Sequence, residues 1–306
     1  MPLVSVIMNV RNGARTLREA IDSVLAQTFQ DWELIVWDDC STDNSAAIIA
    51  GYRDPRIRYH LSPEDVPLGK ARADAIRQAT GDWIAFLDQD DVWLPHKLER
   101  QLALAQNDVG LIYGRTVRFY PSGLQRDYDQ AHEYKPLPEG DIFTQLFTDS
   151  CFIAMSSAMF RRSAIESVGG IPAEVRIIPD YNLYVAVARR YRTRAVQEVV
   201  CRYRMHPGSM SHTAALEMHH EVLWLIDRWA GQLDPQIVAA CHRRHFTAIA
   251  LEEMRSRATL RHGIVRLLTQ GSLSSQLVRP FAFVFHLTRR NLRPPLWRRL
   301  SSKSSV

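Results

Sequence analysis

The sequence predicts an α/β protein whose mostly parallel sheet is flanked by helices, with a helical extension at the C-terminal end. Short apolar segments rich in β-branched residues alternate with segments whose apolar residues recur at helical spacing, and the connections between them are short. The chain has 306 residues, 46% of them hydrophobic, which is enough for one large core and an appended subdomain. No apolar run approaches the roughly 20 residues that cross a bilayer.

The first hundred residues alternate between predicted strands and helices. Strands are expected at four apolar runs: 4–10, 32–37, 57–60 and 83–87. Helices are expected where apolar residues recur at helical spacing: 14–27, 46–52 and 69–79. Arg11-Asn12-Gly13 is the turn after the first strand, and Ser41 or Asp43 is placed to cap the second helix. Such alternation predicts parallel strands that share one carboxyl-terminal edge.

The remaining two thirds of the chain are read in the same way. Alternating polarity predicts a strand at 109–120, the Pro- and Tyr-rich segment 121–140 is read as a loop, and a helix resumes at 141–147. A further helix is expected after Tyr181. Beyond Thr213 the pattern is helical, and three helices are expected there: 214–229, 235–257 and 260–269.

Acidic residues follow two of the predicted strands: Asp38-Asp39 after the second, and Asp88, Asp90 and Asp91 after the fourth. Open α/β sheets bind ligands outside the carboxyl ends of their strands. Three carboxylates within four residues repel one another, and a divalent cation with oxygen ligands relieves that repulsion. The alternative is a solvated acidic turn that caps a helix opened by Pro95, and Asp91 fits this second reading.

One ligand would join the two acidic clusters. In a nucleotide diphosphate, a metal at Asp88 and Asp90 neutralises the pyrophosphate, while the Asp39 carboxylate accepts the N–H of a pyrimidine ring. The first strand is followed by RNGART, which contains neither G-x-G-x-x-G nor G-x-x-x-x-G-K-[ST]. A Rossmann dinucleotide site and a P-loop are therefore both disfavoured.

Cysteine spacing and charge give information on the compartment rather than on the chemistry. The four cysteines are scattered, which indicates neither a zinc site nor a disulfide framework and favours a reducing cytoplasm: Cys40, Cys151, Cys201 and Cys241. The N-terminus lacks the basic region and cleavage site of a signal peptide. The net charge is +5, but residues 254–306 contain eleven basic and no acidic residues, so the rest of the chain is acidic.

Two segments carry a resemblance to a known family: VSVIMNVRNGARTLREAIDSVLAQTFQDWELIVWDDCSTDNS and GDWIAFLDQDDVWLPHKLE. They resemble the N-terminal half of the family 2 inverting glycosyltransferases of GT-A fold, whose sheet is Rossmann-like, and the resemblance extends over roughly residues 3 to 212. It implies that the nucleoside is held by four residues: Asn9, Val10, Arg11 and Asp39. Asp88-Gln89-Asp90 is then the D-x-D element, with Asp90 a direct ligand of Mn²⁺ or Mg²⁺ and Asp88 nearer the ribose and phosphate.

The resemblance implies further roles in the second half of the domain. Asp180 matches the aspartate that deprotonates the acceptor hydroxyl, although its position alone also suits a helix N-cap. His206 matches a histidine that lies over the diphosphate or metal, so it joins Asp90 and Asp88 as a metal-binding candidate. Arg72, at the start of a helix, is expected to reach a phosphate or to be a solvated surface residue, and the solvated reading is preferred for Lys70.

The chain departs from the family pattern at both ends of the site. Arg11 stands where many relatives have an aromatic ring beside the base, and a guanidinium can also stack on a base. Pro179 replaces the glutamate that usually precedes the catalytic aspartate. The Arg11 departure leaves the identity of the donor open, and both departures together leave open a non-enzymatic scaffold that keeps the fold.

The sequence therefore predicts a metal-dependent inverting glycosyltransferase that uses a nucleotide diphosphate sugar, with a UDP-sugar favoured, and a hydroxyl of a glycan or lipid-linked glycan. A catalytically impaired GT-A scaffold and a sugar-phosphate nucleotidyltransferase are the alternatives. The predicted domains are 1–212, divided near residue 107 into nucleotide-binding and acceptor halves, and 213–306.

The aromatic and arginine-rich C-terminal tail predicts peripheral contact with an anionic membrane, on its cytoplasmic face. A disordered tail and a nucleic-acid arm are the alternatives, and no nucleic-acid partner is predicted. Nothing in the sequence indicates the oligomeric state.

Overall fold

The computed structural model describes residues 1–120, 135–149, 151–206, 208, 213–255, 259, 262–264 and 266. The chain forms two compact units, Met1–Cys241 and His242–Val306. All predicted site residues lie in the first unit. The predicted domain boundary at residue 213 describes a different division and stays a prediction.

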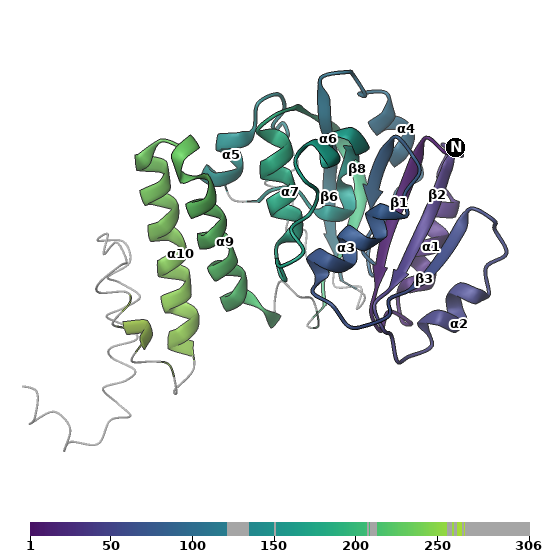
Figure 1. The fold of residues 1–306 in the computed structure, drawn as a ribbon, viewed down its shortest axis with the longest axis horizontal. Helices are drawn as coiled ribbons and strands as arrows, with labels where there is room; N and C mark the ends of the chain where they lie inside the picture. Colours follow the sequence, from purple (N-terminus) through teal and green to yellow (C-terminus); the bar gives the residue numbers. More distant parts are fainter. Residues whose placement is uncertain are drawn as a thin grey trace, which may run out of the picture. The chain divides into compact units, whose positions relative to one another are not determined.

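Within the described residues, the first unit contains one sheet of eight strands in the order β3-β2-β1-β4-β7-β6-β8-β5 (Figure 1). The strands have these bounds: β1 Val4–Val10, β2 Trp32–Asp38, β3 Ile57–Leu61, β4 Trp83–Phe86, β5 Val92–Trp93, β6 Val109–Phe119, β7 Met159–Arg161 and β8 Arg192–Arg204. Parallel pairing joins β3, β2, β1 and β4, so these four strands end at the same edge. The parallel half expected from the alternating pattern is confirmed.

The other half of the sheet is mixed in direction. β7 runs antiparallel to both β4 and β6, β8 is parallel to β6, and β5 is antiparallel to β8. Three of these strands, β5, β7 and β8, were not predicted. β5 and β7 have two and three residues, too short to show a periodic pattern, and the pairing of β8 with β6 is interrupted by register shifts.

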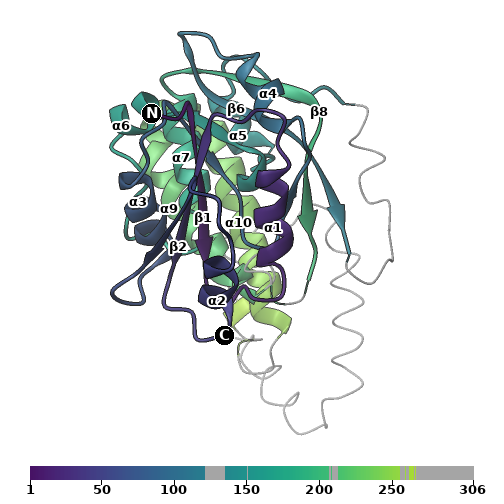
Figure 2. The same ribbon diagram turned by 90° about the vertical axis from the view of Figure 1, so that its right-hand side faces the viewer.

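Helices lie on both sides of the sheet. The helical elements have these bounds: α1 Leu17–Leu25, α2 Ser45–Ala50, α3 Leu68–Arg77, α4 Lys97–Leu102, α5 Phe143–Thr148, η1 Met155–Ser157, α6 Arg162–Ser167, α7 Pro179–Ala188, α9 Ala215–Trp229, η2 Ala230–Gln232 and α10 Pro235–Arg255. Figure 2 shows α3, α6 and α7 on one side of β1 and α1 on the other. α4 begins at Lys97 after an N-cap at His96, so the prediction that Pro95 opens this helix is wrong.

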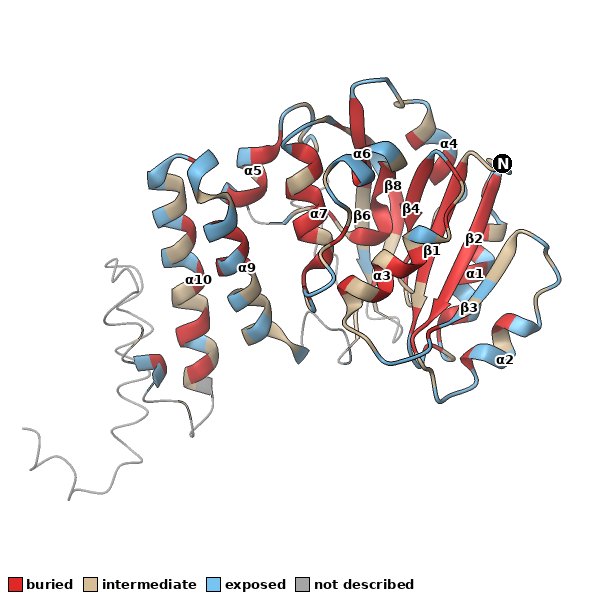
Figure 3. Ribbon diagram, in the orientation of Figure 1, coloured by how far each residue is buried: buried red, intermediate tan, exposed pale blue. Residues whose placement is uncertain are grey.

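Nearly all residues of the central strands β1, β2 and β4 are buried (Figure 3). Every residue of β2 and β4 is buried, because helices cover both faces of the sheet. Trp32, Phe86 and Leu34 are among the largest fully buried side chains. This packing fixes the ends of the strands, from which the acidic loops extend.

No helix among the described residues is long and apolar enough to span a bilayer. The predicted membrane contact concerns the basic tail, and residues 267–306 lie outside the described residues. Most of the predicted helix at 260–269 and of the predicted loop at 121–140 also lies outside them. Those predictions remain open.

Candidate functional site

The loop after β4 is hydrogen-bonded to Ser156 of η1. The Asp88 amide donates to Ser156 Oγ at 3.0 Å, and that hydroxyl donates to Asp91 Oδ2 at 2.6 Å. Asp91 is 1% exposed, and burial, followed by the charges of Asp88 and Asp90, raises the pKa of its carboxyl well above the usual range. Asp91 therefore supports the loop from inside the protein, and its assignment to a helix cap is wrong.

The last residues of β8 connect to the same loop. The Arg204 amide donates to Asp91 Oδ1 at 2.9 Å, and its Nε donates to the Asp90 carbonyl at 2.6 Å. Two residues later, His206 Nε2 lies 2.7 Å from Asp90 Oδ2. The structure thus brings together Asp90 and His206, which are 116 residues apart in the sequence.

The Asp90 carboxylate is an oxygen ligand that suits Mn²⁺ and Mg²⁺, and the His206 imidazole adds a nitrogen ligand that suits a transition metal such as Mn²⁺ better than Mg²⁺. Among the described residues, no group of three or more His, Cys, Asp and Glu side chains is placed to hold a metal ion. Mg²⁺ sites of substrate-phosphate type commonly use one or two protein carboxylates, with the phosphates completing the shell. A two-donor pair beside Asp88 therefore fits a metal that is shared with a diphosphate.

Arg72, on α3, forms an ion pair with Asp88 of this loop. Its NH2 is 2.9 Å from Asp88 Oδ1, and the residue is only 5% exposed. Burial raises the pKa of Asp88, with a further rise from Asp90, while Arg72 lowers it. Arg72 is not the solvated surface residue of the alternative reading, whereas Lys70 forms a partly exposed pair with Asp74 at 2.8 Å.

A second cluster lies at the ends of β1 and β2. The Arg11 amide donates to Gln89 Oε1 at 2.9 Å, and Gln89 Nε2 donates back to the Arg11 carbonyl at 3.1 Å. The Arg11 guanidinium forms a two-pronged pair with Asp65, one contact being 2.7 Å, and lies 3.5 Å from Asp39 Oδ2. Gln89 thereby links the two acidic clusters. Asp65 was missed by the sequence analysis, because it lies in a loop without a recognisable motif.

The predicted nucleoside residues surround this cluster. Burial raises the pKa of Asp39, which is 8% exposed, while the Val66 amide and Arg11 lower it. The Asp39 amide donates to the Val10 carbonyl at 2.8 Å, and Asn9 Nδ2 is buried with no hydrogen-bond partner among the described residues. A water molecule or a ligand can satisfy such a buried donor.

Short side-chain links hold the loops after β1 and β2 together. Asn12 adopts φ +51°, and its amide donates to Ser41 Oγ at 2.9 Å. The N-cap of α2 is Asn44, so the prediction that Ser41 or Asp43 caps this helix is wrong, although Asp43 Oδ1 accepts the Ser45 amide at 2.9 Å. A Cβ on Gly13 would lie 2.3 Å from Gln89 Oε1, so a larger residue here would displace the Gln89 side chain from its hydrogen bonds with Arg11.

Asp180 lies in the first turn of α7, after Pro179 as the first helical residue. The N-cap is Ile178, so Asp180 is not the N-cap of the alternative reading. Burial raises the pKa of Asp180, Arg72 lowers it and Glu221 raises it. Arg72 thus acts electrostatically on both Asp88 and Asp180, which relates the candidate base to the D-x-D loop.

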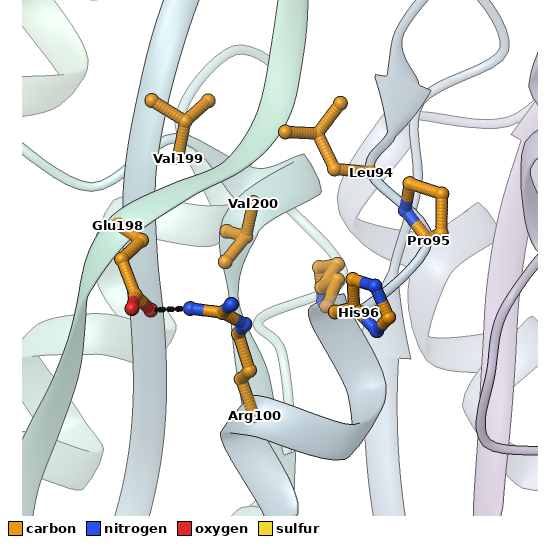
Figure 4. A pocket seen from close by; sticks show the side chains of 8 residues that line it. Leu94, Pro95, His96, Arg100, Glu198, Val199 and Val200 are labelled. Atoms are coloured by element: carbon orange, nitrogen blue, oxygen red, sulfur yellow. Dashed lines mark ion pairs between the residues drawn. The ribbon is translucent and has the colours of Figure 1, made fainter.

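The structure also has a pocket away from these clusters, with a volume of about 260 Å³ (Figure 4). It is lined by residues of the β5–α4 and β8 segments: Leu94, Pro95, His96, Lys97, Arg100, Glu198, Val199 and Val200. The ion pair of Arg100 and Glu198 crosses one side of it. None of the predicted site residues lines this pocket.

Comparisons with known proteins identify the family of this chain. The family model described as Glycosyl transferase family 2 matches residues 5–169. A glycosyltransferase of Nostoc sp. is 34% identical over 220 residues, which cover 69% of this chain and 67% of that protein. WfgD of Escherichia coli, a UDP-Glc:alpha-D-GlcNAc-diphosphoundecaprenol beta-1,3-glucosyltransferase, is 40% identical over 113 residues, which cover 37% of this chain and 45% of WfgD.

One solved structure extends the comparison to nearly the whole chain. The mannosyltransferase PcManGT of Pyrobaculum calidifontis, in complex with GDP-Man and Mn²⁺, matches with a TM-score of 0.65 at 19% identity. The match covers 94% of this chain and 81% of that one. At this identity the similarity concerns the fold, and it confirms the fold class predicted from the sequence.

Proposed function

The chain belongs to glycosyl transferase family 2, and from this premise we propose that it is a metal-dependent inverting hexosyltransferase. Its donor is a nucleotide diphosphate sugar, and its acceptor is a hydroxyl of a glycan or lipid-linked glycan. The observation that carries the proposal is the cluster at the end of β4, where Asp90 meets His206 and Arg72 pairs with Asp88. A carboxylate pair that shares a metal with its ligand, with Arg72 beside it, suits a ligand of concentrated negative charge such as a diphosphate.

Asp180 is the proposed general base. It takes the proton of the acceptor hydroxyl as that oxygen attacks the anomeric carbon, and the bond from this carbon to the diphosphate oxygen breaks. One base without a second, nucleophilic carboxylate implies direct displacement, so the anomeric configuration inverts. Burial raises the pKa of Asp180 toward the working pH, which strengthens it as a base.

Asp90 and His206, with Asp88 beside them, would hold the metal. When bound, Mn²⁺ or Mg²⁺ supplies Lewis-acid stabilisation to the departing diphosphate. Arg72 favours the ionised form of Asp88 and holds this side chain through their 2.9 Å pair. Gln89 holds the backbone of the nucleoside loop through its paired hydrogen bonds with Arg11.

A UDP-sugar is the proposed donor. The Asp39 carboxylate suits the N–H of a uracil ring, Arg11 lies beside it, and the buried amide of Asn9 has an unused donor. The acceptor is proposed from WfgD, whose name describes a diphosphoundecaprenol-linked sugar. A role in cell-surface polysaccharide synthesis, on the cytoplasmic face of a membrane that the basic tail contacts, completes the proposal.

The proposal is tested with purified protein and Mn²⁺. Release of free sugar is screened across UDP-, dTDP-, GDP- and CMP-sugars, and transfer is then measured with the donor that responds. We expect Asp180→Asn to bind the donor nucleotide with unchanged affinity and to lose transfer by a factor of about 10² to 10⁴, the usual contribution of a general base. Asp31→Asn is the control, because Asp31 is exposed and is not one of the proposed site residues. Near-normal transfer by Asp180→Asn would refute the assignment of the base.

A further inference from the structure

A single carboxylate on α9 binds the segment that leads into α7. Glu221 Oε1 accepts the Arg176 amide at 2.9 Å, and its Oε2 accepts the amides of Ile177 and Ile178, each at 2.9 Å. Three consecutive backbone N–H groups thus converge on one side chain from a helix that lies about forty residues later in the chain. Glu221 is outside the residues that the family model matches, 5–169.

Of these three amides, that of Ile178 belongs to the start of α7, and those of Arg176 and Ile177 precede the helix. The N-terminal N–H groups of a helix have no partner within the helix, and Ile178, the N-cap of α7, provides no side-chain cap. A carboxylate that accepts successive amides forms charge-assisted hydrogen bonds, which are shorter and stronger than neutral ones. Glu221 therefore fixes the backbone immediately before Asp180, which is two residues after Ile178.

The same carboxylate also belongs to the electrostatic surroundings of Asp180. Five charged or titratable groups interact electrostatically with Asp180, and they come from five parts of the first unit: Arg72, Asp88, Cys151, Tyr184 and Glu221. Arg72 lowers the pKa of Asp180, whereas Glu221 raises it. Removing the charge of Glu221 would leave the influence of Arg72 less opposed.

We propose that Glu221 is a positioning residue for the proposed base, acting through the backbone of residues 176–178 to set the place of Asp180. This inference rests on the proposed function. It assigns a catalytic contribution to α9, which the sequence places in the helical extension beyond the catalytic domain. The alternative is that Glu221 only ties α9 to the domain.

Glu221→Gln tests the proposal, because glutamine keeps the shape but loses the charge and one acceptor oxygen. We expect kcat to fall by a factor of about 10 to 100, the scale of a small misplacement of a catalytic group, with donor KM and UDP affinity within about twofold of wild type. Because the pKa of Asp180 falls without Glu221, the acidic limb of the pH profile of kcat should move to lower pH. Glu221→Asp, which keeps the charge, should leave this limb at the wild-type pH.

Glu217→Gln is the matched control, since it changes an exposed glutamate one turn earlier on α9. Thermal melting of each variant establishes that it is folded. A wild-type kcat and pH profile for Glu221→Gln, alongside an inactive Asp180→Asn, would overturn the positioning role and leave the proposed function intact. A lower kcat for Glu221→Gln with an unmoved acidic limb would also overturn it, because a purely structural tie predicts that result.

Discussion

The buried amine of Lys97 makes a quantitative prediction about stability and pH. Lys97 is 0% exposed, its Nζ donates to Gln101 Oε1 at 2.6 Å, and it lies 4.0 Å from the centre of the Trp93 ring. Burial lowers the pKa of Lys97 from 10.5 to about 7, and the nearby Cys201 opposes this fall. Carrying the charged form in the folded state therefore weakens the fold.

The magnitude follows from the difference between these pKa values. Each pKa unit corresponds to about 1.4 kcal/mol, so the charged amine costs about 5 kcal/mol relative to the neutral amine. Between the two pKa values the unfolded chain binds more protons than the folded chain, so stability rises with pH. Integrated from about pH 6 to about pH 9, the contribution of Lys97 to the free energy of unfolding increases by about 2 to 3 kcal/mol.

The assay is urea denaturation of wild type and Lys97→Met at about pH 6 and about pH 9. Other titrating groups cancel in the difference between the two proteins, and loss of the Gln101 hydrogen bond adds an offset independent of pH. We expect the difference in free energy of unfolding to move by about 2 to 3 kcal/mol in favour of wild type at the higher pH. Lys135→Met, at an exposed position, is the control and should show no such change. A constant difference for Lys97→Met would refute the reasoning.

Three further predictions concern the site. Asp90→Asn should weaken Mn²⁺-dependent nucleotide binding at least tenfold in calorimetry, and unchanged metal dependence would contradict its role as a ligand. Asp65→Asn should release Arg11 and weaken UDP binding by about three- to tenfold, because the loss of a paired hydrogen bond costs about 1 kcal/mol. Glu64→Gln, which removes a charge from the same loop, is the control. Equal losses of UDP affinity in both variants would show a general charge effect and contradict the prediction. Ser156→Ala should lower the free energy of unfolding by about 1 to 3 kcal/mol in urea denaturation, because it leaves a buried carboxylate without its hydroxyl partner; a change below about 0.5 kcal/mol would contradict this.

The sequence was informative wherever local pattern determines structure. The buried strands β1, β2 and β4 are continuous apolar runs, and the parallel arrangement followed from the helices between them. Once those strands are parallel, Asp39 and Asp88 must leave the sheet at one edge, so the location of the candidate site could be predicted.

Contacts between distant segments could not be predicted in this way. Asp65 and Glu221 act through loop conformations that no local pattern reports. The acidic run after β4 did not reveal which carboxylate faces inward, and burial decides that Asp91 is the supporting one. Lysine is a residue type that is rarely fully buried, so the sequence alone predicts that Lys97 lies at the surface.

The pairing of β5 with β8 has a consequence for the order of folding. β5 directly follows the D-x-D loop, yet its pairing partner is the segment around Cys201 and Arg202, more than a hundred residues later. Closing so long a loop is slow, because its entropy must be lost before the contact forms. We therefore expect the parallel strands to form first during synthesis, and the nascent chain to acquire tight donor binding only after β8 has left the ribosome.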